Sequence, residues 1–277
     1  MKCILPLVLS IFTISCTLSA ATYLNTSGTS QDILNTSGAP HPYSGNNLAP
    51  NAILPNANLS RAFLNDADLT DADLRYADLR YAFLANAFLT NADLTGAALA
   101  SAELTDAFLT NTDLTDADLK DADLTDADLK YADLNDADLR GADLTGVDLT
   151  DADLKSAELN DADLNNADLR YADLSGADLS GADLSGADLR GADLTDANLR
   201  DADFTDANLS NAYFSKAQNV GAAVWSGATF SEDAISPNAT YEQAWFESQG
   251  ATFVAETFKY GLFHGGLALG LVALRRR

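Results

Sequence analysis

A five-residue phrase, Ala-Asp-Leu followed by two variable residues, recurs without a gap from about Asn51 to Phe214. An α-helix cannot keep these leucines on one side, because five residues at 100° each leave about 140° of rotation per repeat. A straight strand fails as well, because five is odd and successive leucines would alternate between the two faces. The chain must therefore change direction once per repeat.

The residue types within one repeat indicate where this change of direction occurs. Ala177 and Leu179 are two residues apart and share a face of an extended segment, while Asp178 points the opposite way. The pair that follows, Ser180-Gly181, consists of typical turn residues, as do the Thr-Asp, Asn-Asp and Thr-Gly pairs of other repeats. A turn at each pair lets every Ala and Leu face a common interior. This pattern predicts a solenoid, whose units bury their apolar faces by stacking.

The phrase resembles that of the pentapeptide-repeat family, and the resemblance covers about 33 consecutive repeats. It implies an all-β fold, a right-handed quadrilateral β-helix with four repeats, and hence about 20 residues, per coil. About eight such coils, spaced by about 4.8 Å, would make a rod on the order of 40 Å long. Four inward positions depart from the phrase, and all four substitutes could pack inside: Thr112, Val147, Phe204 and Phe214.

The chain divides into five expected segments. Residues 1–21 combine Lys2, an apolar run and a small-residue end, which is typical of a secretory signal peptide, with lipidation at Cys16 as an alternative. Residues 22–50 are rich in Ser, Asn, Gly and Pro and predict a linker or an N-terminal cap. The repeats fill residues 51–217, and residues 218–258 are the expected C-terminal cap region.

A short capping helix is expected within residues 218–258. Ser236-Pro237-Asn238 is a helix-start pattern, and the helix would run from Ala239 to Gln249. Tyr241 and Trp245 would then share one helical face and cover the last coil, which solenoids require for solubility.

Residues 259–277 form a hydrophobic tail that closes with three arginines. The tail resembles the C-terminal sorting signal of exosortase-processed bacterial surface proteins, although the Pro-Glu-Pro motif of that signal is missing. A plain membrane anchor is the alternative. The apolar stretch, Tyr260 to Leu274, is shorter than the roughly 20 residues of a full membrane span.

A 20-residue coil places residues 20 apart in stacked columns. Neighbouring carboxylates in such a column repel each other by about 0.9 kcal/mol at the dielectric constant of water, and nearby Lys and Arg residues are expected to offset part of this. One column predicts a core ladder of Leu74, Leu94, Leu114, Leu134, Leu154, Leu174 and Leu194. The column beside it predicts an acidic ladder of Asp73, Asp93, Asp113, Asp133, Asp153, Asp173 and Asp193.

Four phenylalanines occupy outward positions in the early coils, where Asp usually stands. The column rule predicts that Phe63 stacks on Phe83 and that Phe88 stacks on Phe108, on neighbouring faces. Exposed apolar patches commonly mark surfaces for a partner or for self-association. The four residues are therefore a candidate interaction patch, unless residues 22–50 fold back over them.

Composition excludes several classes of function. The net charge of -25 argues against direct nucleic-acid binding, which requires Lys and Arg to neutralise phosphates. Cys3 and Cys16 both lie in the leader, and His41 and His264 are isolated, so no nucleophile and base can be paired. We therefore expect no enzyme activity, no catalytic residues, no cofactor and no bound metal.

The sequence predicts a non-enzymatic exported β-solenoid that acts as a structural or protein-interaction module at the bacterial cell envelope, surface or outside the cell. Its expected partners are an unidentified protein or a second copy, and a membrane through the C-terminal segment before any processing. One alternative is an acidic DNA mimic that binds a type II topoisomerase. A weaker alternative is a surface protein whose carboxylate ladders collect divalent cations such as Ca²⁺.

Overall fold

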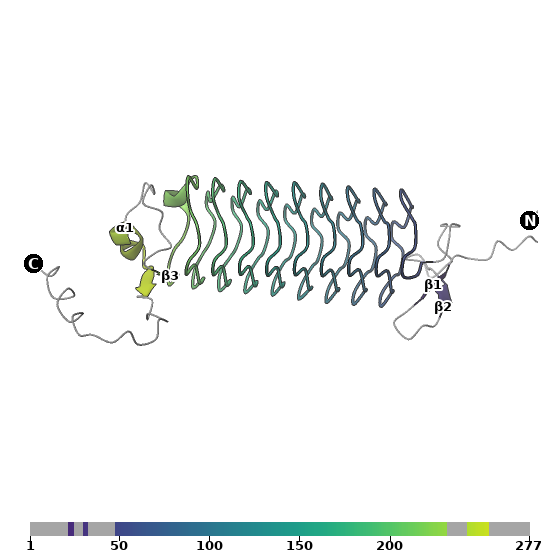
Figure 1. Cartoon of the computed structure of the whole chain (residues 1–277). Helices are drawn as coiled ribbons and strands as arrows, with labels where there is room; N and C mark the ends of the chain where they lie inside the picture. Colours follow the sequence, from purple (N-terminus) through teal and green to yellow (C-terminus); the bar gives the residue numbers. More distant parts are fainter. Residues whose placement is uncertain (1–21, 25–29, 33–47, 232–242, 255–277) are drawn as a thin grey trace, which may run out of the picture.

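The computed structural model describes residues 22–24, 30–32, 48–231 and 243–254. Residues 48–231 form a solenoid of regular coils, which Figure 1 shows from the side. Parallel bridges join outward residues that are 20 apart in sequence, as between Asp73 and Asp93. Four repeats therefore make one coil, and the repeat phrase predicted this β-solenoid. The right-handed sense of the coil stays a prediction.

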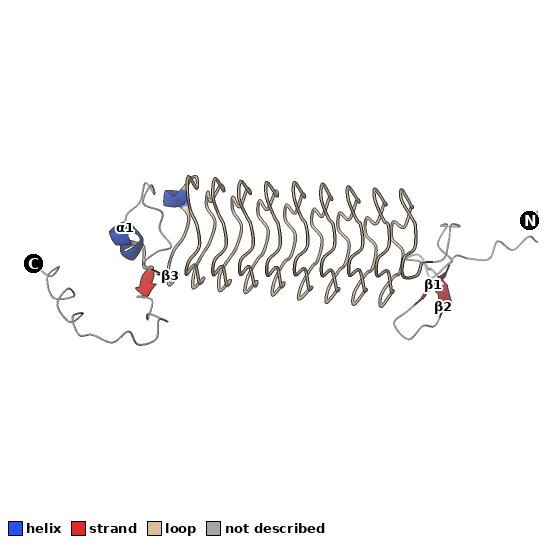
Figure 2. Cartoon of the chain, in the orientation of Figure 1, coloured by secondary structure: helices blue, strands red, loops and turns tan. Residues whose placement is uncertain are grey.

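Backbone hydrogen bonds tie each coil to its neighbours. The outward Asp93 donates its N–H to the carbonyl of Ala72 at 2.9 Å, and Leu74 donates to the carbonyl of Asp93 at 2.7 Å. Ala77 closes the turn by donating to Leu74 at 3.0 Å, and the fifth residue of most repeats donates to the next coil, as Tyr76 does to the carbonyl of Thr95 at 2.9 Å. One N–H per repeat, that of the residue after Leu, is left for a side-chain acceptor. Because each face holds a single bridge residue, Figure 2 draws the coils as loops.

The corner of each repeat requires a left-handed backbone at the fifth residue. Glycine adopts this conformation without strain, as at Gly191 with φ 73°. Four tyrosines adopt it too, with φ between 57° and 61°, although bulky side chains rarely do so. The hydrogen bonds to the coils on either side hold them there. These four residues are Tyr76, Tyr81, Tyr131 and Tyr171.

Alanine and leucine fill the interior from one end of the described solenoid to the other. All seven leucines of the predicted core ladder are at most 1% exposed. The four departures from the phrase are also buried, with Phe214 the most accessible at 6%. The hydroxyl of Thr112 donates to the carbonyl of Leu89 at 2.8 Å, so this one polar departure is satisfied inside the core.

The coil path gains one residue near the C-terminal end. Asn198 bridges to Gln218, 20 residues on, whereas Asp203 bridges to Val224, 21 residues on. The short 3-10 helix η1 (Val220–Ala222) lies within this longer turn. Stacking continues to β3 (Thr229–Ser231), which pairs in parallel with β4 (Thr252–Val254).

An aromatic cluster closes the C-terminal end of the core. Trp225 lies flat on Phe204, with ring centroids 4.6 Å apart and planes 2° apart. Phe246, from helix α1 (Gln243–Ser248), contacts Trp225 at 5.2 Å and Phe230 at 5.1 Å. The capping helix is thus present and is described from Gln243 to Ser248, while its expected start at Ala239 lies outside the described residues. Among the described side chains the capping aromatic is Phe246, which the sequence analysis did not single out. The side chains of the proposed pair, Tyr241 and Trp245, lie outside the described part of the chain.

Two strands precede the solenoid, β1 (Thr22–Leu24) and β2 (Ser30–Asp32), and they pair antiparallel within the expected linker or cap. The predicted signal peptide, Cys16, and the C-terminal tail of residues 259–277 lie outside the described residues. Within the part of the chain that the structure describes, no helix combines the length and the apolar character needed to cross a bilayer.

Candidate interaction surfaces

The outward aspartates have a structural role in the repeats. Oδ1 of Asp143 accepts a hydrogen bond from the N–H of Thr145 at 3.0 Å, and Asp183 accepts one from Ser185 at 2.9 Å. These N–H groups have no backbone acceptor. In each case the carboxylate two residues earlier accepts the hydrogen bond, as in an Asx turn. The sequence analysis treated these Asp residues as outward-pointing charges and missed this role. Asparagine makes the same bond at Asn208, so the shared Asp/Asn preference was the available signal.

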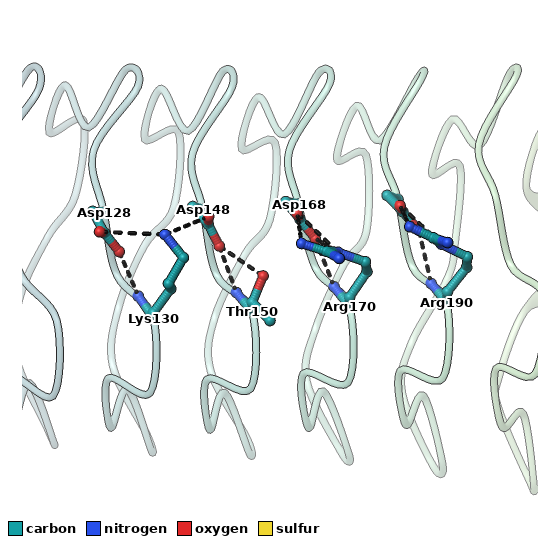
Figure 3. Close-up of polar contacts among 8 residues, drawn as sticks. Asp128, Lys130, Asp148, Thr150, Asp168, Arg170 and Arg190 are labelled. Carbon is teal, nitrogen blue, oxygen red and sulfur yellow. Dashed lines mark hydrogen bonds and ion pairs between the residues drawn. The ribbon is translucent and has the colours of Figure 1, made fainter.

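Ion pairs neutralise much of one face, which Figure 3 shows in close-up. Nζ of Lys130 lies 3.3 Å from Asp128 and 2.7 Å from Asp148, so it bridges two coils. Farther along the same column, Arg170 is bidentate on Asp168, with its shortest contact at 2.6 Å. The expectation that cations beside the ladders offset carboxylate repulsion is confirmed on this face.

These contacts shift the pKa values of the carboxylates. Burial by itself would raise the pKa of Asp148, but hydrogen bonds from Lys130 and Thr150 lower it overall. On another face, the side-chain hydrogen bond from Arg80 is the largest influence on Asp78 and lowers the pKa of that carboxyl. Both groups are therefore ionised and paired near neutral pH.

The predicted acidic ladder, Asp73 to Asp193, stacks as expected in one column of parallel bridges. It is partly neutralised. Arg75 contacts Asp73 at 2.7 Å and Asp93 at 3.4 Å, and Lys155 makes equivalent contacts farther along. The predicted acidic ladder is the most regular column of carboxylates in the sequence, but another column has fewer of its carboxylates paired with cations.

A different column holds carboxylates without nearby cations. The residues after Leu on this face, from Asn65 to Thr205, are only Asn, Ala, Thr and Ser. None of its six stacked carboxylates lies within ion-pair distance of a Lys or Arg among the described residues. We name this column the acidic face: Glu103, Asp123, Asp143, Asp163, Asp183 and Asp203. The acidic face could have been identified from the sequence, by comparing the outward residues of each column with the residues that follow Leu in the same column.

The four outward phenylalanines stack as predicted. Ring centroids are 4.5 Å apart both for Phe63 and Phe83 and for Phe88 and Phe108, with planes within 25°. Phe108 is 39% exposed, and the other three are partly buried by the stacking. The rings therefore present mainly their edges to solvent.

Other large exposed side chains lie near these phenylalanines. Ile53 is 70% exposed at the outward position of the first coil, and Tyr76 and Tyr81 are 62% and 51% exposed at corners of the second. The guanidinium of Arg61 lies 5.3 Å from the ring centre of Tyr81. We name the combined set the aromatic collar: Ile53, Phe63, Tyr76, Tyr81, Phe83, Phe88 and Phe108.

Nothing among the described residues resembles a catalytic or metal centre. No group of three or more His, Cys, Asp or Glu residues in the described ranges is placed to hold a metal ion. One surface hollow lies at a corner, where Gly141 leaves a gap between the side chains of Asp121 and Asp161. The two cations that line it are Lys120, which pairs with Asp138 at 2.5 Å, and Arg140, which pairs with Asp138 and Glu158.

The family model described as pentapeptide repeats matches the chain in eight copies between residues 52 and 218. Solved structures that are similar to the chain include HetL, QnrB1 and Rfr23. HetL, a pentapeptide repeat protein involved in heterocyst differentiation regulation in Nostoc sp. strain PCC 7120, is 39% identical over 65% of this chain and 85% of its own, with a TM-score of 0.36. QnrB1, a plasmid-mediated fluoroquinolone resistance protein, is 18% identical over 64% of this chain and 89% of its own, with a TM-score of 0.41. Rfr23, from the cyanobacterium Cyanothece 51142, is 32% identical over 35% of this chain and 61% of its own, with a TM-score of 0.30. No curated protein matches the chain.

Proposed function

Because the chain belongs to the pentapeptide-repeat family, we propose that it is a non-enzymatic interaction scaffold exported to the bacterial cell envelope or surface. Proteins of this family are generally structural or interaction modules. The observation that carries the proposal is the uniform placement of polar groups. Ala and Leu fill the described interior, and the carboxylates repeat at equivalent outward positions, where burial distinguishes no acid–base pair. Such a molecule presents surfaces rather than a reaction centre.

The export part of the proposal is supported by the two ends of the sequence. Residues 1–21 have the charge, apolar run and small-residue end of a signal peptide, and residues 259–277 have the apolar tail and arginines of a surface-sorting or anchoring segment. Both cysteines lie in the leader, so a processed chain would need no disulfide to fold outside the cytoplasm.

Cell fractionation with intact-mass measurement of the native protein tests the export proposal. We expect the protein in the envelope or medium, with a mass that lacks residues 1–21 or that carries a lipid on Cys16. The same spectrum reports whether Arg275 to Arg277 are retained. A full-length mass, with Met1 intact, in the cytosol would reject export.

A second candidate is an acidic DNA mimic that binds a type II topoisomerase, and the acidic face favours it. Six carboxylates without paired cations line one side of a straight rod, which resembles the closely spaced negative charges along one strand of a duplex backbone. A supercoiling assay with a type II topoisomerase tests this candidate. Asp→Asn at Asp123, Asp143, Asp163 and Asp183 keeps the Asx hydrogen bonds and should abolish inhibition. Four Asp→Asn changes on the opposite face, from Asp113 to Asp173, serve as the control.

The weaker candidate, divalent-cation collection, follows from the same carboxylates. Each column supplies one carboxylate per coil and no enclosing cage, whereas Ca²⁺ takes about six to eight oxygen ligands. Titration calorimetry with millimolar Ca²⁺ tests it directly, because absence of heat would reject it.

A further inference from the structure

Large apolar side chains at outward positions are concentrated at the N-terminal end of the repeats, and two further exposed ones, Tyr213 and Val224, lie at the opposite end. In the first three coils, outward positions hold Ile53, Phe63, Phe83, Phe88 and Phe108. From Asp113 to Asn208, all twenty outward positions hold Asp, Glu or Asn. The aromatic collar therefore has an abrupt limit along the rod axis, about two coil spacings, or roughly 10 Å, above the first coil.

The collar also extends over three of the four faces of the rod rather than occupying one side. Ile53 stands on one face, and Phe63 and Phe88 begin the stacks on two further faces. Tyr76 and Tyr81 project from two of the corners between faces. An occupant that contacts the whole collar must therefore approach along the rod axis.

The area available on any one side is small. Three coils spaced by about 4.8 Å, on a face about 15 Å wide, offer roughly 200 Å². A stable protein–protein interface needs about 800 Å² from each partner. A side-on protein partner, a second copy included, would therefore bury too little of the collar for a stable complex.

We propose that the aromatic collar seats this end of the rod in a lipid headgroup surface, with the acidic coils projecting into water. This inference deepens the proposed envelope function and rests on it. A depth of roughly 10 Å matches the layer in which interfacial segments bury their apolar faces. Tyrosine and phenylalanine edges suit this layer, because the rings are apolar while the tyrosine hydroxyl remains hydrated.

Arginines accompany part of the acidic charge in the collar coils. Residues 51–110 hold eight acidic residues against three arginines, and two of the aspartates, Asp73 and Asp78, are each paired with an arginine at 2.7 Å. Arginine can contact lipid phosphates through the donors that its carboxylate leaves unused. Beyond Phe108, the unbroken outward carboxylates oppose deeper entry, because charged groups lose hydration in lipid.

Tyrosine footprinting on the full chain tests the proposal. The probe is hydroxyl-radical labelling with and without vesicles of phosphatidylcholine and phosphatidylglycerol, read by mass spectrometry. We expect labelling of Tyr76 and Tyr81 to fall about fivefold or more with vesicles, because the interface excludes water from them. Tyr131 and Tyr171 are matched internal controls at the same left-handed corner position, 56% and 64% exposed, and should not change.

A collar variant provides the second arm. Phe63→Asp, Phe83→Asp, Phe88→Asp and Phe108→Asp restore the usual residue of the repeat at each position, together with its Asx acceptor, so the coils should still form. Circular dichroism checks that they do. The combined variant should lose the protection of Tyr76 and Tyr81.

Three outcomes would overturn the proposal. Protection of Tyr213, in the last coil, without protection of Tyr76 would assign vesicle binding to the opposite end and its tail. Protection that rises with protein concentration in the absence of lipid would assign the collar to a second copy. Protection retained in the collar variant would assign attachment to the N-terminal leader. None of these outcomes alters the mass measurement that tests export, so the two proposals fail separately.

Discussion

The first three coils and the five coils that follow share one interior and differ on the outside. Leu74 and Leu154 are both fully buried in the same ladder, with the same hydrogen bonds to the next coil. Outside, the early coils carry the aromatic collar, and the later coils carry only Asp, Glu or Asn at the outward positions. The inward residues therefore specify the coil, and the outward position can vary without changing the backbone.

The outward position is nevertheless not energetically neutral. In the later coils its carboxylate completes the backbone hydrogen bonding of the corner, as Asp143 does for Thr145. Phenylalanine cannot accept that bond. Where Phe83 stands, Oδ1 of Asn65 in the preceding coil accepts the N–H of Ala85 at 3.1 Å, and the ring of Phe83 stacks on Phe63. The two regions thus stabilise the same corner by different means.

The largest expected effect lies in the interior and should be equal in both regions. Leu74→Ala and Leu154→Ala each remove a fully buried side chain, and each should lower the free energy of unfolding by about 2–5 kcal/mol. Urea denaturation followed by circular dichroism measures both. A difference between them of more than about 2 kcal/mol would mean that the two interiors are not equivalent.

Removing one outward carboxylate should have a smaller effect. Asp143→Ala leaves the N–H of Thr145 without its acceptor and should cost about 0.5–2 kcal/mol, as loss of a comparable helix cap does. Thermal denaturation measures the loss. Asp143→Asn is the matched control, because the amide oxygen still accepts the bond. Equal losses for Ala and Asn would show that the charge, not the hydrogen bond, matters there.

The ion pairs of the later coils should give a smaller, pH-dependent contribution. Lys130→Met removes the bridge between Asp128 and Asp148, and the pKa of Asp148 should rise. The pKa of Asp148 is lower in the folded state than in the unfolded state, where it is near 3.8. The ion pair therefore stabilises the protein fully at pH values above 3.8, and this stabilisation is lost as the pH falls through the pKa of the folded state. We expect a loss of about 0.2–1 kcal/mol at pH 7.

Carboxyl titration by NMR together with denaturation at pH 7 and pH 2 checks this prediction. Lys130→Arg keeps the positive charge and is the control. A stability loss that stays the same at pH 2 would assign the effect to packing of the lysine stem rather than to the ion pair.

The smallest expected effect is a change in stability that should have opposite signs on two faces: the acidic face, and the face on which Lys130 pairs with Asp128 and Asp148. Asp143→Asn removes a charge that only repels its neighbours and should stabilise the protein by a few tenths of a kcal/mol at low salt. Asp148→Asn removes a carboxylate that Lys130 pairs with and should destabilise it by a similar amount. Both differences should shrink in 1 M NaCl, where screening is strong. The same sign for both variants would contradict the contrast between the faces.

Much of this architecture was predictable from sequence, because its contacts repeat with a period. Once residues 20 apart are placed in columns, the core ladder, the acidic ladder and both phenylalanine stacks follow. The burial of Thr112 and Val147 follows from the same rule. The C-terminal closure was less predictable. One extra residue before Val224 ends the period, and Phe246 reaches the last coil from outside the repeats.

The repeat phrase by itself determined that the chain coils, since only a turn in every repeat can bring each Ala and Leu to one interior. Tertiary structure decided how the outside is used. Whether a carboxylate meets a cation, as Asp148 meets Lys130, or meets none, as Asp143, depends on the residue that stands on the same face one coil away. The need for an Asp at all appears only when the bonds between coils leave one N–H per repeat without a backbone acceptor. The ion pair is a contact across coils, and the free N–H is a consequence of the bonds between coils; hydrogen bonds and ion pairs depend on distances that the order of residues alone does not set.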